Sequence, residues 1–261
     1  MSSISAALTE TAKPVALVTG AAKRIGRAIA LSLAQAGYDI AVHYGTSADD
    51  AALLAEQLGA LGVRAVPVQA DLSDPAQASA LIAQSREALG PIHVLINNAS
   101  VFADDRVATV TADSWRLHID TNLLAPILLS QAFAAQPDLA AGASIINLID
   151  QRVLKPSPPF FSYGLSKAGL WHATRTLAQA LAPRIRVNAV GPGPTLKSIH
   201  QTQADFDREA RATLLQKPTS PEEVATTVLY LLNAPSVTGQ MICVDSGQHL
   251  EWRSADDDEF S

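Results

Sequence analysis

The chain has 261 residues, of which 48% are hydrophobic and 17% are charged, and its formal net charge is −6. This length and composition fit one α/β domain with a full core. Lysine and arginine residues are scattered singly rather than in a basic stripe, and no apolar run approaches membrane length. We therefore expect no nucleic-acid partner, no membrane partner and a cytoplasmic location.

Short runs rich in β-branched residues alternate with helical segments along the chain. The predicted strands are Val15–Val18, Ile40–Tyr44, Ala65–Gln69, Val94–Asn97, Ser144–Ile149, Arg186–Val190 and Met241–Val244. The spacing of Ala, Leu and Gln predicts helices at Ile25–Ala36, Asp49–Leu61, Pro75–Leu89 and Tyr163–Leu181. This alternation is typical of a Rossmann-type, doubly wound parallel sheet of seven strands in a single α/β domain.

The domain is expected to span residues 14–250, between a flexible N-terminal segment, 1–13, and an acidic C-terminal tail, 251–261. Two stretches, Gln151–Phe161 and Gly191–Thr219, are expected to be irregular. Both follow the carboxyl ends of predicted strands, where such folds bind ligands. Within the second stretch, we expect the loop from Thr195 to Lys217 to close over a substrate, with Thr195 near the mouth of the pocket.

The single cysteine, Cys243, lies in the apolar run of the last predicted strand. One cysteine cannot form an intrachain disulfide, and an apolar strand is the usual place for a buried structural thiol. We expect neither a catalytic role for it nor a metal site.

A glycine-bearing turn, Thr19-Gly20-Ala21-Ala22-Lys23-Arg24-Ile25-Gly26-Arg27, follows the first predicted strand. Glycine lets the backbone approach a pyrophosphate, and the N-terminus of the following helix supplies N–H groups and a positive dipole. Arg24 takes the place of the middle glycine of the usual three. The turn predicts cofactor contacts by Gly20, Lys23, Arg24 and Ile25; a tight turn without a ligand is the alternative.

The end of the second predicted strand bears on the choice between NAD and NADP. Enzymes that prefer NAD place an acid there for the ribose 2′-hydroxyl, whereas this chain reads His43-Tyr44-Gly45-Thr46-Ser47 and has no acid until Asp49. Donors or charge for a 2′-phosphate are offered by Lys23, His43, Thr46 and Ser47, and Tyr44 is assigned to the same site. NADPH is favoured over NADH. A loop leading to a helix cap is the alternative for Thr46 and Ser47.

Asp71 and Leu72, after the third predicted strand, are also assigned to the cofactor. The Asp71 carboxylate has two interpretations: it accepts from the adenine amino group, or it caps the next turn.

Tyr163 and Lys167 stand four residues apart on a predicted helix, so they share one face. The positive charge of Lys167 is expected to favour the tyrosinate and move the tyrosine pKa from about 10 towards working pH. An ordinary amphipathic pair is the alternative.

An ordered set of motifs accompanies that pair: Thr19-Gly20 to Gly26, Asn97-Asn98-Ala99, Asp120-Thr121-Asn122, and Asn188-Ala189-Val190-Gly191-Pro192-Gly193. From about Pro14 to Leu250 the chain therefore resembles the short-chain dehydrogenase/reductase family. The resemblance implies that Lys167 also holds the nicotinamide ribose and that Asn122 anchors a water linking Lys167 to solvent. Both would belong to a proton relay.

Asp150 stands thirteen residues before Tyr163, where this family usually has a serine. A serine hydroxyl donates to a carbonyl oxygen, whereas an ionised aspartate only accepts and would repel developing negative charge. An aspartate that holds or relays a proton suits a basic nitrogen, which indicates a C=N substrate such as a pterin. A structural role in the loop up to Phe161 is the alternative.

Within the family the chain looks most like the pteridine reductases and dihydromonapterin reductases. The narrower match rests on Gly20 to Arg27, His43-Tyr44, Asn97-Asn98-Ala99-Ser100 followed by Phe102, Asp150 with Tyr163, and Gly191-Pro192-Gly193. It implies that Arg24 faces pyrophosphate and substrate and that Phe102 stacks the pterin against nicotinamide. The substrate residues so assigned are Arg24, Ser100, Phe102, Asp150, Tyr163 and Gly193. Further cofactor contacts are assigned to Asn98, Ala99, Ser100, Tyr163, Lys167, Gly193 and Thr195.

The resemblance also implies a homotetramer, while Gly45 and Thr46 depart from the larger or basic residues of pteridine reductases, which puts strict NADP selectivity in doubt. The leading hypothesis is an NADPH-dependent reductase of a small-molecule pterin, dihydropterin to tetrahydropterin, with a proton passed by Asp150 and Tyr163. A reductase of another imine, or of a carbonyl such as a 3-oxoacyl thioester, is an alternative. A non-catalytic NADPH sensor is another, against which the intact Tyr163, Lys167 and Asn122 argue.

Overall fold

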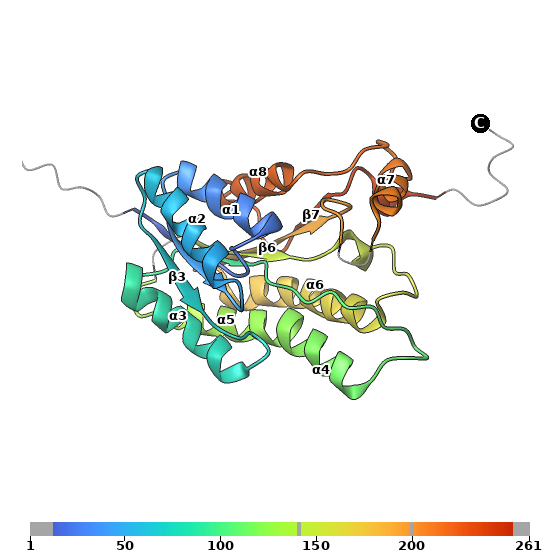
Figure 1. Ribbon diagram of the computed structural model, residues 1–261. Helices are drawn as coiled ribbons and strands as arrows, with labels where there is room; N and C mark the ends of the chain where they lie inside the picture. Colours follow the sequence, from blue (N-terminus) through green and yellow to red (C-terminus); the bar gives the residue numbers. More distant parts are fainter. Residues whose placement is uncertain (1–12, 140–141, 199–200, 253–261) are drawn as a thin grey trace, which may run out of the picture.

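A computed structural model describes residues 13–139, 142–198 and 201–252 and contains a seven-stranded sheet between two layers of helices (Figure 1). The strands are β1 (Val15–Val18), β2 (Asp39–Tyr44), β3 (Ala65–Gln69), β4 (Val94–Asn97), β5 (Ala143–Leu148), β6 (Ile185–Pro192) and β7 (Met241–Val244). They pair in parallel in the order β3-β2-β1-β4-β5-β6-β7. The predicted doubly wound fold is confirmed, and its order reverses between β1 and β4, where such sheets bind ligands.

Helices cover both faces of the sheet (Figure 1). One face carries α1 (Arg24–Gln35), α2 (Ala48–Ala60) and α8 (Pro221–Leu232); the other carries α3 (Pro75–Leu89), α4 (Ala112–Ile119), α5 (Ala125–Ala134) and α6 (Phe161–Leu181). Three short turns complete the order: a π-helical turn η1 (Asp120–Leu124) and the 3₁₀ turns η2 (Gln151–Val153) and η3 (Gln248–Leu250). Among the described residues, no helix combines the length and apolar character that crossing a membrane requires.

One helix, α7 (Gln203–Arg211), falls inside the stretch that was expected to be irregular, so that expectation is wrong here. Thr202 accepts a hydrogen bond from the Asp205 N–H, and the Asp205 carboxylate accepts from the Thr202 N–H. This reciprocal capping box satisfies the first turn of a short helix that has little apolar face of its own.

The strands read as continuous apolar runs because both faces of the sheet are covered. All residues of β1 and β5 are buried. One core cluster packs beneath α1 and α8 and includes Ile29 and Leu33, one helical turn apart. A second cluster packs beneath α3, α5 and α6 and includes Phe133, which is fully buried. Each large side chain buried in this way stabilises the fold by roughly 1.5–3 kcal/mol.

In the turn between β1 and α1, the backbone of Gly26 lies very close to Gly20 and to Asn98 at the end of β4. Gly20 has φ +62°, a left-handed conformation that favours glycine. A Cβ at Gly26 would lie 2.3 Å from the Gly20 carbonyl oxygen and 2.5 Å from Nδ2 of Asn98. Only glycine at position 26 therefore lets α1 begin directly against the turn and the end of β4.

Gly26→Ala should lower the free energy of unfolding by about 1–3 kcal/mol, because the methyl group meets main-chain atoms that cannot move aside. The matched control is Gly59→Ala in α2, where the same methyl group meets nothing within 4 Å. It should raise the stability by about 0.5–1 kcal/mol through helix propensity. Urea unfolding measures both changes; equal effects of the two substitutions would contradict this account.

Candidate active site

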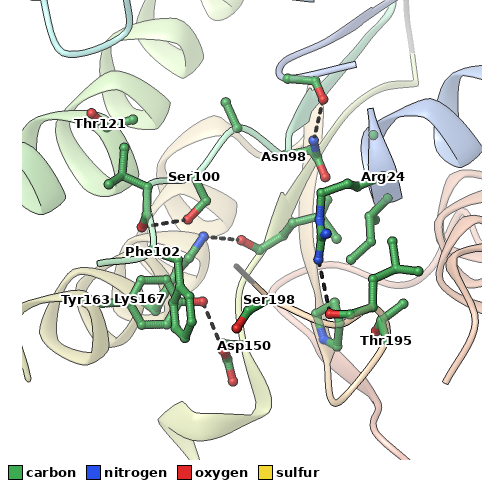
Figure 2. A pocket seen from close by; sticks show the side chains of 18 of the residues that line it. Arg24, Asn98, Ser100, Phe102, Thr121, Asp150, Tyr163, Lys167, Thr195 and Ser198 are labelled. Carbon is green, nitrogen blue, oxygen red and sulfur yellow. Dashed lines mark hydrogen bonds between the residues drawn. The ribbon is translucent and has the colours of Figure 1, made fainter. Parts of the chain in front are cut away.

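A cleft with a volume of about 1010 Å³ lies at the carboxyl edge of the sheet. Its lining follows the strand ends, with Gly20 after β1, Thr46 after β2, Asp71 after β3, Asn98 after β4 and Asp150 after β5. Figure 2 shows Phe102, Tyr163 and Lys167 on one side of this cleft and Arg24 and Thr195 on the other. The parallel topology thus brings together segments that are far apart in sequence.

With two exceptions, Tyr44 and Asn122, the residues predicted for the site line this cleft. They are Gly20, Lys23, Arg24, Ile25, His43, Thr46, Ser47, Asp71, Leu72, Asn98, Ala99, Ser100, Phe102, Asp150, Tyr163, Lys167, Gly193 and Thr195. Tyr44 lies at the end of β2 and packs against the core cluster beneath α1.

The hydrogen bond predicted between Tyr163 and Asp150 is present. The Tyr163 hydroxyl donates to Oδ2 of Asp150 at 2.9 Å, and the other carboxylate oxygen accepts from the Arg152 N–H at 2.8 Å. Burial raises the pKa of Asp150, although the Arg152 charge and the hydrogen bonds act in the opposite direction. The carboxyl group therefore holds a proton more readily than an exposed aspartate.

The expectation that Lys167 lowers the Tyr163 pKa is wrong in this structure. The Lys167 Nζ lies 5.8 Å from the centre of the Tyr163 ring and donates to the Leu148 carbonyl at 2.9 Å. Burial, and then the negative charge of Asp150, raise the Tyr163 pKa well above 10. Burial also lowers the pKa of Lys167 to about 8, against the attraction of Asp150. Burial and Asp150 thus favour the neutral phenol over the tyrosinate.

The first turn of α6, which carries Tyr163, is held from outside the helix. Its N-cap residue, Phe160, makes no side-chain cap. Instead, Asp105 accepts from the Ser162 N–H at 2.9 Å, from the Ser162 hydroxyl, and from the Ser114 hydroxyl at 3.0 Å. Burial acts to raise the Asp105 pKa, but these hydrogen bonds outweigh it and lower the pKa. An ionised carboxylate is stabilised at a helix N-terminus.

His118 completes this buried network. Its Nε2 accepts from the Ala103 N–H at 3.2 Å, so the proton is assigned to Nδ1, which lies 2.7 Å from the Ser162 hydroxyl oxygen. Burial lowers the His118 pKa, and the ring stays neutral. The sequence reasoning missed both Asp105 and His118. The only local signal was the pair of acids that follows the Asn97-Asn98-Ala99 motif.

Asn122 lies in the π-helical turn and fixes the loop after β4. Its amide accepts from the Val101 N–H at 2.8 Å and the Ser100 hydroxyl at 3.2 Å, and donates to the Val101 carbonyl at 2.9 Å. It also donates to the Ser166 hydroxyl at 3.2 Å. The side chain therefore joins this loop to α6 beside Lys167, and the water relay stays a prediction.

His43 has a structural task that its position in the sequence did not indicate. Its Nδ1 accepts from the Gly20 N–H at 3.0 Å, so Nε2 carries the proton and donates to the Ala70 carbonyl at 3.1 Å. Burial lowers the His43 pKa to about 4. The ring is neutral and both nitrogens hold main-chain groups. It supports the glycine turn instead of offering charge to a phosphate.

The remaining groups assigned to this end, Lys23, Thr46, Ser47 and Asp71, line the cleft as well. Lys23 pairs with Asp50 at 2.8 Å, and neither Asp49 nor Asp50 lines the cleft. Ser47 precedes α2 without a side-chain cap. Oδ1 of Asp71 accepts from the N–H and the hydroxyl of Ser73, at 2.9 and 2.7 Å, so its turn-capping role is present.

Arg24 and Gly193 both line the cleft. Arg24 adopts φ +55°, although it replaces a glycine, and its guanidinium donates to the Leu196 and Lys197 carbonyls at 3.1 Å each. It thereby joins the first turn to the loop after β6. A Cβ at Gly193 would lie 2.6 Å from the Asp245 Cβ, so close packing alone requires this glycine.

An aromatic wall stands beside the hydrogen-bonded pair of Tyr163 and Asp150. Phe102 stacks on Phe160 with ring centres 4.1 Å apart, and its ring meets the Tyr163 ring edge-on at 4.7 Å. Arg152 lies over Phe160, 5.2 Å from its centre. Sequence reasoning missed several lining residues after β5 and β6: Gln151, Arg152, Phe160, Ser198, Gln201, Asp205, Phe206 and Glu209. Their positions after strand carboxyl ends were the only signal.

The family model described as "Enoyl-(Acyl carrier protein) reductase" matches residues 20–249. The chain belongs to the short-chain dehydrogenase/reductase family. It is 34% identical over 240 residues to the 3-oxoacyl-[acyl-carrier-protein] reductase FabG of Staphylococcus aureus, covering 90% of this chain and 98% of the relative.

Two solved structures of the family are more similar in sequence. The FolM alternative dihydrofolate reductase 1 of Brucella canis, complexed with NADP, has a TM-score of 0.88 and 43% identity, covering 94% of this chain and 98% of the other. The protein of the same name from Brucella suis, also with NADP, has a TM-score of 0.89 and 44% identity over the same shares. The expected cofactor agrees with these complexes.

Lys167 should make cofactor binding pH-dependent. With a pKa of about 8 in the free protein, its ammonium group loses its proton as the pH rises through 8, so NADPH should bind about tenfold more weakly by pH 9.5. Equilibrium fluorescence titration measures this. Lys167→Met should bind weakly without this pH dependence. Tyr163→Phe should retain the pH dependence of NADPH binding, because the phenol of Tyr163 titrates at a much higher pH. If Tyr163→Phe lost this pH dependence, the titrating group would be the phenol and not Lys167.

His43 should contribute to acid lability. Its pKa is about 4 when folded and 6.5 when unfolded, so the unfolded chain binds the proton first. Stability from this group is complete above pH 6.5 and falls by up to about 3 kcal/mol as the pH drops towards 4. Urea unfolding between pH 4 and 7 should show this component in the parent and in the exposed control His172→Asn. His43→Asn should lack it; an unchanged pH dependence would contradict the assignment.

Proposed function

We propose that this protein is an NADPH-dependent reductase that acts on a pterin-type C=N bond, converting a dihydropterin to a tetrahydropterin. The observation that carries the proposal is the 2.9 Å hydrogen bond between the Tyr163 hydroxyl and the Asp150 carboxylate. At the position of Asp150 the family usually has a serine, whose hydroxyl donates a hydrogen bond. A carboxyl group with a raised pKa supplies a proton to nitrogen in a way that a serine does not.

The cofactor site supports NADP(H). The glycine turn leaves room for a pyrophosphate, Lys23 with Thr46 and Ser47 would receive the 2′-phosphate, and Lys167 would hold the nicotinamide ribose. When bound, the reduced cofactor supplies the hydride. The names of the Brucella proteins add support, since they are called dihydrofolate reductases and hold NADP.

The chain's own residues supply the proton and the placement. Tyr163 and Asp150 share a hydrogen bond, so one can give a proton to the substrate nitrogen while the other refills it across 2.9 Å. The Phe102 ring lies in the cleft beside this pair, and an aromatic side chain at that place suits a flat heterocycle. Lys167 and Asn122 lie behind Tyr163, at the buried end of the proposed relay.

A 3-oxoacyl thioester remains the second candidate substrate because the FabG relative carries that activity in its name. The ionised form of Asp150 argues against it, since a carboxylate would face the negative charge that develops on a carbonyl oxygen. The sensor alternative is weaker still, because a protein that only binds NADPH does not require the buried Tyr163 and Lys167 arrangement.

The deciding experiment compares substrates and variants. Purified protein with NADPH should oxidise the cofactor in the presence of dihydrobiopterin or dihydromonapterin, and much less with a ketone or a 3-oxoacyl thioester at equal concentration. Asp150→Asn and Tyr163→Phe should each lower pterin kcat by about 10²–10⁴, because each removes a proton carrier, while the Kd of NADPH stays within a few-fold.

Asp113→Asn, which changes an exposed acid on α4, is the matched control and should leave turnover unchanged. Asp150→Ser should shift the ratio of kcat/KM values towards carbonyl substrates. Turnover of thioesters alone by the parent, or full pterin turnover by Asp150→Asn, would sink the proposal.

The proposal includes a cytoplasmic homotetramer, as the family resemblance implies. Light scattering of the purified protein measures its oligomeric state, and a monomer at the concentration used in the assay would contradict the homotetramer.

A further inference from the structure

A second, smaller cavity of about 190 Å³ adjoins the cleft and shares Gln151, Arg152 and Gln248 with it. Its other walls come from Lys155 with the two residues that follow it, and from Glu251 near the end of the described chain. Neither Tyr163 nor Asp150 lines this cavity, although the Arg152 backbone N–H donates to the Asp150 carboxylate. The cavity therefore needs its own explanation.

Two polar atoms in the shared wall are buried and have no hydrogen-bond partner among the described residues: Oε1 of Gln151 and Nε of Arg152. The Gln151 residue is only 6% exposed. Native proteins satisfy nearly all buried polar groups, so these two unpaired atoms, one acceptor and one donor, each lack a partner that a ligand could supply. The partner must accept from a guanidinium and donate to an amide oxygen.

The direction from the reaction centre to this cavity runs along the aromatic wall. Tyr163 meets Phe102 edge-on, Phe102 stacks on Phe160, and the Arg152 guanidinium lies over Phe160. A substrate ring placed beside Phe102 therefore has Arg152 at the far side of the same wall. Arg152 also lines the smaller cavity, which connects this wall to it.

The charges around the cavity suit an anion. Lys155 pairs with Glu251 at 2.7 Å, and both side chains are partly exposed, at 42% and 35%. Arg152 donates to the Ser157 hydroxyl at 3.2 Å, which is a neutral partner. The acids nearby are engaged: Asp150 with Tyr163, and Glu209 with Gln248 at 3.2 Å. An incoming carboxylate can replace Glu251 at Lys155 and pair with Arg152.

We propose that Gln151, Arg152 and Lys155 form a subsite for an anionic substrate tail. Its ligand is a pterin that bears an aryl amide ending in a carboxylate, as dihydrofolate does. The amide N–H of such a tail fits the Gln151 oxygen, and the carboxylate fits Arg152 with Lys155. This inference rests on the proposed function and deepens it, since it makes Arg152 a determinant of which pterins the enzyme prefers.

The test measures kcat/KM with saturating NADPH for dihydrofolate and for dihydrobiopterin, which has no anionic tail. Arg152→Gln should lower the ratio of the two values about tenfold, as expected for a lost charge-assisted pair. The ratio cancels any effect of the Arg152 charge on Asp150, because both substrates use the same carboxyl group. Lys155→Gln should lower the ratio less. The control Arg116→Gln, an exposed arginine on α4 paired with Asp113, should leave it unchanged.

A second readout does not depend on turnover. Calorimetry should show that 4-aminobenzoyl-glutamate binds the NADP-loaded parent and binds Arg152→Gln at least fivefold more weakly. If the parent reduces dihydrobiopterin but Arg152→Gln changes neither the ratio nor this binding, the subsite is overturned and the proposed function stands. If the parent reduces no pterin, the proposed function fails. In that case the thioester substrates are compared. If Arg152→Gln lowers turnover of a 3-oxoacyl pantetheine 4′-phosphate more than turnover of the same compound without its phosphate, the subsite binds a phosphate, and the carboxylate assignment is overturned.

Discussion

The hydrogen bond from Tyr163 to Asp150 joins the end of β5 to the first turn of α6, and a contact of 2.9 Å requires that both segments are fixed. The β5 side is fixed by the sheet. The helix side depends on Asp105, whose carboxylate caps α6 from the loop after β4. The same loop carries Phe102 and is joined to α6 again by Asn122. One network therefore positions both the proton carrier and the aromatic face beside which a substrate would lie.

Burial gives this site its electrostatic character. Asp150, Tyr163 and Lys167 each have a pKa displaced towards the neutral form, and burial is the largest cause for each. This burial lowers the stability of the fold. Below pH 8 Lys167 is charged in the folded protein, and burial of that charge is unfavourable; the penalty fades as the pH rises from about 8 to 10.5. Such displaced values cluster where proton transfer occurs. Tyr163 is buried and Asp150 is partly buried, and both line the cleft.

Much of the fold was predictable because its information is local. Strands buried on both faces read as apolar runs, and the glycine turn, Tyr163, Lys167 and Asp150 were found by spacing along the chain. What escaped prediction depends on contacts across the sequence. Arg24 reaches carbonyls more than 170 residues away, and Asp105 caps a helix 57 residues further on. The predicted direction of the Tyr163 pKa shift was wrong. Burial and the charge of Asp150 raise this pKa, and the Lys167 ammonium group donates to the Leu148 carbonyl instead of to the phenol.

Two features of the cleft favour the same class of substrate for independent reasons. A developing oxyanion would lie beside the Asp150 carboxylate, which only accepts hydrogen bonds while ionised, whereas a ring nitrogen can receive the proton that Asp150 and Tyr163 share. The stack of Arg152, Phe160 and Phe102 extends the site in one direction and ends at a positive charge. A flat, nitrogen-containing ring that carries an acidic tail satisfies both constraints together. A flexible acyl chain has no flat ring to stack on the aromatic wall and no basic nitrogen to receive the proton.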